Sequence, residues 1–133
     1  MSFLLDTDTC SFHLKRPAGL MHRFVQHAGT LHLSSVVLAE LDTWAFRRPN
    51  PVPLLHTITH DLLPEVTLLD FDAACAMRFG QERGILLQHG IQIPTADLMI
   101  ASTALVHNLT LATHNIADYQ NIPGLRLVDW FVP

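Results

Sequence analysis

Short apolar runs alternate with longer helix-like segments along the whole chain, and this alternation constrains the fold more than any other feature. Strands that are joined by helices usually form a parallel sheet whose two faces are both covered by helices. We therefore expect an α/β three-layer sandwich with a mostly parallel central sheet. Strands are expected at residues 3–5, 31–33, 66–69, 110–112 and 125–128, and helices near residues 10–14, 20–27, 34–46, 54–63, 72–90 and 95–108.

Polar residues mark where several of these helices begin. Ser34 or Ser35, Asp72 and Thr95 each precede an apolar helical pattern and are expected to act as caps. Three prolines make residues 47–53 a loop, and this loop is too short to separate two domains. With 133 residues and no internal repeat, the chain is expected to form a single domain over residues 1–133.

Composition and charge narrow the class of protein. Apolar residues make up 49% of the chain, and the net charge of −4 argues against a broad basic face for nucleic acid. A small site in which metal ions neutralise acidic side chains remains compatible with that charge. Cys10 and Cys75 form no disulfide framework, no signal peptide is evident, and residues 98–106 are too short to span a membrane. A cytoplasmic protein is expected.

The first strand ends in acidic residues, in the sequence SFLLDTDTC at positions 2–10. Asp6 directly follows the apolar run, so it is expected at the carboxyl end of a buried strand, where parallel sheets bind ligands. A carboxylate in that position needs a compensating partner, because burying an unpaired charge is unfavourable. That partner is a metal ion, a phosphoryl group or the backbone of a turn.

Two further acids lie on apolar helix faces. Glu40 shares a stripe with Val36, Val37 and Trp44, and Asp97 shares one with Ile100 and neighbouring apolar residues. Each has an ordinary explanation, since Glu40 can reach solvent and Asp97 can favour a helix N-terminus. Together with Asp6, however, they would repel one another unless a cation lay among them. A few carboxylates with open water positions are the ligands that Mg²⁺ or Mn²⁺ prefers.

Four segments in this order resemble PIN-domain ribonucleases, specifically the VapC-type toxins of bacterial toxin–antitoxin pairs. They are LLDTDT, LSSVVLAEL, IPTADLMIASTALVHNLTLATHN and IPGLRLVDW, and the resemblance covers essentially the whole chain. The resemblance implies a metal-dependent endoribonuclease that hydrolyses phosphodiester bonds in tRNA or another structured RNA. It also implies a cognate antitoxin as partner and a homodimer.

The same resemblance assigns roles to individual residues. Asp6, Glu40 and Asp97 would hold Mg²⁺, for which Mn²⁺ would substitute, and Asn115 would orient a water molecule. Asp8 would either cap the next helix, which we favour, or add charge to the metal site. Thr7, Thr113 and Arg16 are candidates for contacts with the substrate or for support of the site. The chain departs from the common family pattern at Asp8, Val37, Trp44 and Asn115.

Three other interpretations each fit part of the sequence, and the zinc site is the one that the sequence argues against, because no third ligand is evident. DTDT also fits the opening motif of haloacid-dehalogenase-type phosphatases, with Asp6 as nucleophile, but the single lysine, Lys15, is too early for that family's lysine motif. His56 and His60 have the spacing of a helical zinc pair, yet the residue after His56 is not the glutamate of a zinc protease. Finally, a PIN domain could bind RNA or antitoxin without cleaving RNA.

Overall fold

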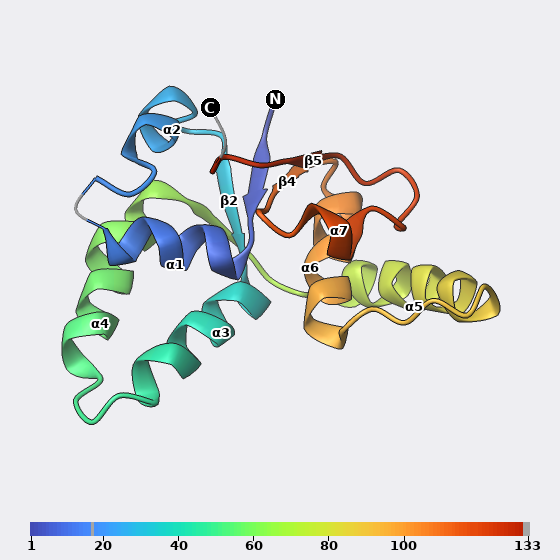
Figure 1. Ribbon diagram of the computed structural model, residues 1–133, viewed down its shortest axis with the longest axis horizontal. Coiled ribbons are helices and arrows are strands. Elements are labelled where there is room, and N and C mark those ends of the chain that lie inside the picture. Colours follow the sequence, from blue (N-terminus) through green and yellow to red (C-terminus); the bar gives the residue numbers. More distant parts are fainter. Residues whose placement is uncertain (17, 132–133) are drawn as a thin grey trace.

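The computed structural model describes residues 1–16 and 18–131, which form a parallel sheet with helices on both faces (Figure 1). The predicted α/β sandwich is confirmed. Every strand pairing is parallel, and the strand order is β3-β2-β1-β4-β5. The strands are β1 (Phe3–Leu5), β2 (Leu31–Ser34), β3 (Thr67–Leu69), β4 (Thr110–Ala112) and β5 (Leu127–Val128). The helices are α1 (Thr7–Lys15), α2 (Met21–Gln26), α3 (Ser35–Phe46), α4 (Val52–Thr57), the π-helix η1 (Ile58–Leu62), the 3-10 helix η2 (Leu63–Glu65), α5 (Ala73–Gln88), α6 (Thr95–Val106) and α7 (Ile116–Tyr119).

The strand order places the first strand at the centre of the sheet. The chain runs from β1 through β2 to β3 on one side and then continues through β4 to β5 on the other side. The order therefore reverses at β1, and such a reversal point is where parallel sheets usually bind ligands. Asp6 follows β1 directly, and its N–H donates to the carbonyl oxygen of Ala112 at the end of β4, at 3.2 Å. The acid thus lies at the reversal point.

The core is built from the central strands and the helices that cover them. Leu4, Leu5, Leu33 and Leu111 are completely buried, as expected for strands covered on both faces. In Figure 1, α1 and α4 lie to the left of the sheet and α5 and α6 to its right. Helix α3 packs against α1 on one side and contacts α6 on the other. This arrangement brings the N-terminal parts of α1 and α6 and one face of α3 toward the end of β1.

Several details of the predicted elements were wrong. Thr95 does not cap α6: it is the first helical residue, Pro94 is the N-cap, and the Thr95 hydroxyl accepts a hydrogen bond from Arg83 at 3.1 Å instead. The first helix is longer than predicted and starts at Thr7, because Asp6 itself caps it. Ser34 and Asp72 cap α3 and α5 as predicted.

The sequence pattern also missed or simplified some segments. The helix expected at 54–63 is α4 followed by η1 and η2, the last strand is shorter than expected, and α7 was not predicted at all. Within residues 1–16 and 18–131, no helix is both long and apolar enough to cross a membrane.

Candidate active site

A cavity of about 120 Å³ opens at the carboxyl end of β1, and acidic side chains dominate its lining. Four carboxylates reach it from three helices and the strand end, which lie far apart in the sequence. Of the candidate residues from the sequence, the structure brings together Asp6, Thr7, Asp8, Glu40, Asp97 and Asn115, and it adds Ile100 and Tyr119.

Asp6 is held in place by the start of α1. Its side chain is only 3% exposed, and its Oδ1 accepts the N–H of Thr9 at 2.8 Å, which caps the helix. The Thr9 hydroxyl in turn donates to the carbonyl of Ala112 at 3.0 Å, which ties α1 to β4. Burial raises the pKa of Asp6 above its ordinary value, although hydrogen bonds from Thr113 and Thr9 oppose that shift. Asp6 is therefore a fixed carboxylate whose charge is unfavourable without a cation.

Asp97 lies in the first turn of α6 and has a similarly perturbed environment. Its pKa is raised, first by burial and then by the negative charges of Glu40, Asp118 and Asp6. A hydrogen bond from the Tyr119 hydroxyl acts in the opposite direction. The electrostatics thus couple the three acids that the sequence singled out, since Glu40 and Asp6 act on Asp97 across the cavity.

Sequence reasoning missed Tyr119. Its side chain is buried, and burial together with the charge of Asp97 raises its pKa, so the hydroxyl keeps its proton and donates a hydrogen bond to Asp97. Tyr119 is the only tyrosine of the chain and follows Asn115 by four residues. Those two signals, with α7 recognised as a helix, would have placed it beside Asn115.

Replacing Tyr119 by phenylalanine tests this contact. Tyr119→Phe is expected to raise the pKa of Asp97 further, because the mutation removes a donor that favours the charged form. It should also lower the free energy of unfolding at neutral pH by about 1 kcal/mol. Carboxyl ¹³C NMR titration measures the first effect and thermal unfolding the second. Asp72, whose pKa is lowered by the N–H of Cys75, serves as an internal control and should titrate unchanged.

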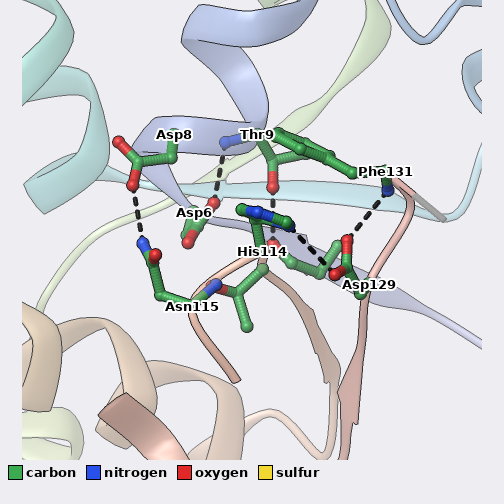
Figure 2. Close-up of polar contacts among 9 residues, drawn as sticks. Asp6, Asp8, Thr9, His114, Asn115, Asp129 and Phe131 are labelled. Atoms are coloured by element: carbon green, nitrogen blue, oxygen red, sulfur yellow. Dashed lines mark hydrogen bonds and ion pairs between the residues drawn. The ribbon is translucent and has the colours of Figure 1, made fainter. Parts of the chain in front are cut away.

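Asp8 and Glu40 are each held by a polar neighbour. The Asn115 amide donates to the Asp8 Oδ2 at 2.6 Å (Figure 2), and the Thr7 hydroxyl donates to the Glu40 Oε1. The favoured prediction that Asp8 caps the next helix was therefore wrong: Asp6 occupies the N-cap, which leaves the Asp8 carboxylate free to turn toward Asn115. Asp8 instead adds a fourth carboxyl group to the lining of the cavity.

The remaining candidates lie outside the cavity. Thr113 is buried, with 1% of its surface exposed, and its hydroxyl accepts the N–H of Asn115 at 3.0 Å, so it positions Asn115. Arg16 is exposed and its guanidinium lies 4.4 Å from the ring centre of Phe12. The rings of His56 and His60 are 4.1 Å apart on α4 and η1, and neither histidine lines the cavity.

The donor set of the cavity fits a hard divalent cation. Carboxylate oxygens, an amide and hydroxyl groups are the ligands that Mg²⁺ and Mn²⁺ prefer. Among residues 1–16 and 18–131, no three histidine, cysteine, aspartate or glutamate side chains are already gathered closely enough to hold a metal. Glu40 instead accepts a hydrogen bond from Thr7, and Asp8 accepts one from Asn115.

Comparisons with known proteins agree with this geometry. The model of the PIN domain family matches residues 3–124. The chain is 35% identical over 131 residues to the tRNA(fMet)-specific endonuclease VapC of Shigella flexneri, covering 98% of both chains. It is 33% identical over 133 residues to ribonuclease VapC2 of Rickettsia felis, again covering 98% of both. Its fold matches the crystal structure of VapBC2 from Rickettsia felis bound to a promoter DNA fragment, with a TM-score of 0.90, 32% identity and coverage of 98% and 99% of the two chains.

Proposed function

Because the chain belongs to the PIN-domain family and to its VapC-type ribonucleases, we propose that it cleaves tRNA in a reaction that requires Mg²⁺. The observation that carries this proposal is the convergence of Asp6, Asp8, Glu40 and Asp97 on one cavity at the reversal point of the sheet. Metal-assisted hydrolysis of a phosphodiester needs such a cluster, whereas an aspartyl-phosphate mechanism needs a lysine near the nucleophile.

Support for tRNA as the substrate comes from relatives. The proteins of Shigella flexneri and Salmonella typhimurium, 35% and 32% identical to this chain, are named tRNA(fMet)-specific endonucleases. Other relatives at similar identity are named only as ribonucleases. A tRNA, with tRNA(fMet) as the first candidate, is therefore the substrate that we propose.

Each residue of the site has its own role in the proposed reaction. Asp6, Glu40 and Asp97 would hold Mg²⁺, which when bound lowers the pKa of a water molecule and neutralises charge on the attacked phosphate. Asn115 positions a water molecule through its amide once that amide is released from Asp8. Thr7 holds the Glu40 carboxylate in the cavity, and Thr113 holds the backbone of Asn115. Water is the nucleophile, so no side chain has to form a covalent intermediate.

We also propose an antitoxin as the binding partner and a homodimer as the assembly. The solved structures with similar folds include VapBC complexes from Rickettsia felis and Salmonella typhimurium, at 32% identity and TM-scores of 0.90. The chain has exposed apolar side chains that such contacts would cover, among them Val25, Phe46 and Met77. Light scattering of the purified chain, alone and with its antitoxin, measures both assemblies.

A cleavage assay tests the proposed activity. The purified chain is incubated with tRNA(fMet), with other tRNAs and with an unstructured RNA, in the presence of Mg²⁺. We expect discrete fragments of tRNA(fMet) that disappear with EDTA, return with Mn²⁺, and are absent for Asp97→Asn. Cleavage that persists in EDTA would exclude the metal.

Two outcomes would favour a phosphatase or a non-catalytic PIN domain over the metal-dependent ribonuclease. Hydrolysis of a phosphate monoester that is lost in Asp6→Asn, without RNA cleavage, would favour the phosphatase. Tight binding of RNA or antitoxin by both wild type and Asp97→Asn, again without cleavage, would favour a non-catalytic PIN domain.

A further inference from the structure

A row of aromatic side chains lies beside the acidic cavity and has no part in the proposed chemistry. The His114 and Phe131 rings are stacked, with centres 4.6 Å apart and planes inclined by 12°. The Phe12 ring contacts Phe131 in a tilted arrangement, with centres 4.3 Å apart and planes inclined by 33°, and the Arg16 guanidinium lies 4.4 Å from the centre of Phe12. We call Phe12, Phe131 and His114 the ring row; its members come from α1 and from the segments after β4 and β5.

One carboxylate fixes the end of the ring row that is nearest the cavity. Asp129 pairs with the His114 Nδ1 through one oxygen at 3.0 Å and accepts the N–H of Phe131 through the other at 2.9 Å (Figure 2). The pairing of β4 with β5 allows this, because Thr113 donates its N–H to the Val128 carbonyl at 2.9 Å and so places the next residues side by side. The two rings are therefore held face to face before any ligand binds.

His114 is the link between the ring row and the cavity. It precedes Asn115, whose amide reaches Asp8 in the cavity, while its own side chain is 55% exposed. Because Phe131 stacks on one face of the imidazole, a further ring would have to stack on the opposite face. A fixed, exposed ring next to a phosphodiester-cleaving site suits an unpaired base, because bases stack on aromatic and histidine rings.

Stacking would supply an affinity for RNA that the net charge of the chain does not supply. With a net charge of −4 and a single lysine, the protein has little general attraction for RNA. Stacking on a ring does not depend on a basic surface. Arg16, at the far end of the ring row, adds a positive charge where the RNA backbone would leave the site.

We propose that an unpaired base next to the cleaved phosphodiester stacks on the exposed face of His114 and extends the ring row. His114 is then a substrate-binding residue, and Asp129 is the residue that positions it. This inference rests on the proposed ribonuclease function, and it predicts a contribution to substrate binding that is equal in the ground state and the transition state. Such a contribution appears in KM and not in kcat.

The test compares His114→Ala and His114→Phe in the complete chain, with the tRNA that the wild type cleaves. His114→Ala should raise KM about tenfold, within the range of about five- to 150-fold that the loss of one stacked base implies. Its kcat should stay within about twofold, because uniform binding does not affect it. His114→Phe should keep KM close to the wild-type value, since phenylalanine stacks but cannot pair with Asp129. His89→Ala, which removes another exposed histidine at the end of α5, is the matched control and should change neither constant.

An RNA variant tests the same contact from the substrate side. A tRNA that lacks the base on one side of the cleaved bond should be cleaved equally by wild type and His114→Ala when the missing base is the stacked one. An unchanged KM for His114→Ala would overturn the inference, and so would a His114→Phe variant as weak as His114→Ala, which would indicate the contact with Asp129 instead. Weakened antitoxin binding with unchanged KM would assign the ring row to that protein interface. No cleavage by wild type would overturn the proposed function as well.

Discussion

Asp6→Asn is expected to lower kcat/KM for RNA by about 1000-fold and, at the same time, to stabilise the metal-free protein. The loss of activity follows from removing one charged partner of a buried metal site, which costs about 3–5 kcal/mol. The gain in stability follows from the burial of Asp6, which is 3% exposed and whose pKa lies above its ordinary value of 3.8. Asparagine keeps the hydrogen bond to the Thr9 N–H, so the helix cap survives the substitution.

The pH dependence of stability follows from the same shifts. The pKa values of Asp6 and Asp97 are raised in the folded chain, so their favourable contribution is complete below about pH 3.8 and declines as the pH rises through the folded pKa values. At neutral pH, the metal-free wild type therefore carries a cost that Asp6→Asn avoids. We expect the Tm of Asp6→Asn without metal to exceed that of the wild type by about 3 °C, equivalent to about 1 kcal/mol.

With Mg²⁺ bound, the wild type should have a higher Tm than Asp6→Asn. A ligand that binds only the folded state stabilises it in proportion to the logarithm of its concentration. Millimolar Mg²⁺ or Mn²⁺ is therefore expected to raise the Tm of the wild type and to leave that of Asp6→Asn nearly unchanged. Thermal unfolding with EDTA and with each cation measures both effects. An Asp6→Asn protein that is less stable than wild type in EDTA would show that Asp6 has a favourable partner in the metal-free state.

The positions of Asp6, Glu40 and Asp97 could be predicted because each depends on a local periodicity. An apolar run of three residues sets the end of the first strand, and helical spacing sets which acids share the buried faces of α3 and α6. Parallel strands then bring those positions to one edge of the sheet. The end of an apolar run and helical spacing need only neighbours in sequence, so they predicted the element that carries each acid, whereas the meeting of the acids in one cavity also depends on the strand order.

The features that the sequence did not predict are contacts between distant segments. By local rules either Asp6 or Asp8 could cap the first helix. In the structure the Asp6 side chain accepts the Thr9 N–H, and the Asp8 carboxylate accepts from the Asn115 amide, far along the chain. Tyr119 lies in a four-residue helix that is too short to show a period. The ring row depends on the pairing of β4 with β5, and one sequence does not specify which strands are neighbours in a sheet.

Glu40→Gln and Asp42→Asn each neutralise one acid of α3. Comparing the two variants separates the effect of charge inside the cavity from the effect of charge elsewhere on the helix. Two residues apart on a helix correspond to a rotation of about 200°, so the two acids point in nearly opposite directions. Glu40 lines the cavity, and Asp42 is not among the residues that do. Glutamine preserves the size of Glu40 and still accepts the hydrogen bond from the Thr7 hydroxyl, so the variant loses a charge and little else.

We expect Glu40→Gln to lower kcat/KM for the cleaved tRNA by more than about 100-fold. Mutating a residue that only supports a metal ligand already lowers metal affinity or activity by about 10- to 100-fold. Asp42→Asn should stay within about twofold of wild type, the usual result for a substitution outside a site. Calorimetric titration with Mn²⁺ should show weaker binding for Glu40→Gln alone, which assigns the loss to the metal. If both variants lost activity equally, the reaction would require the total negative charge of α3 and not the position of Glu40 in the cavity.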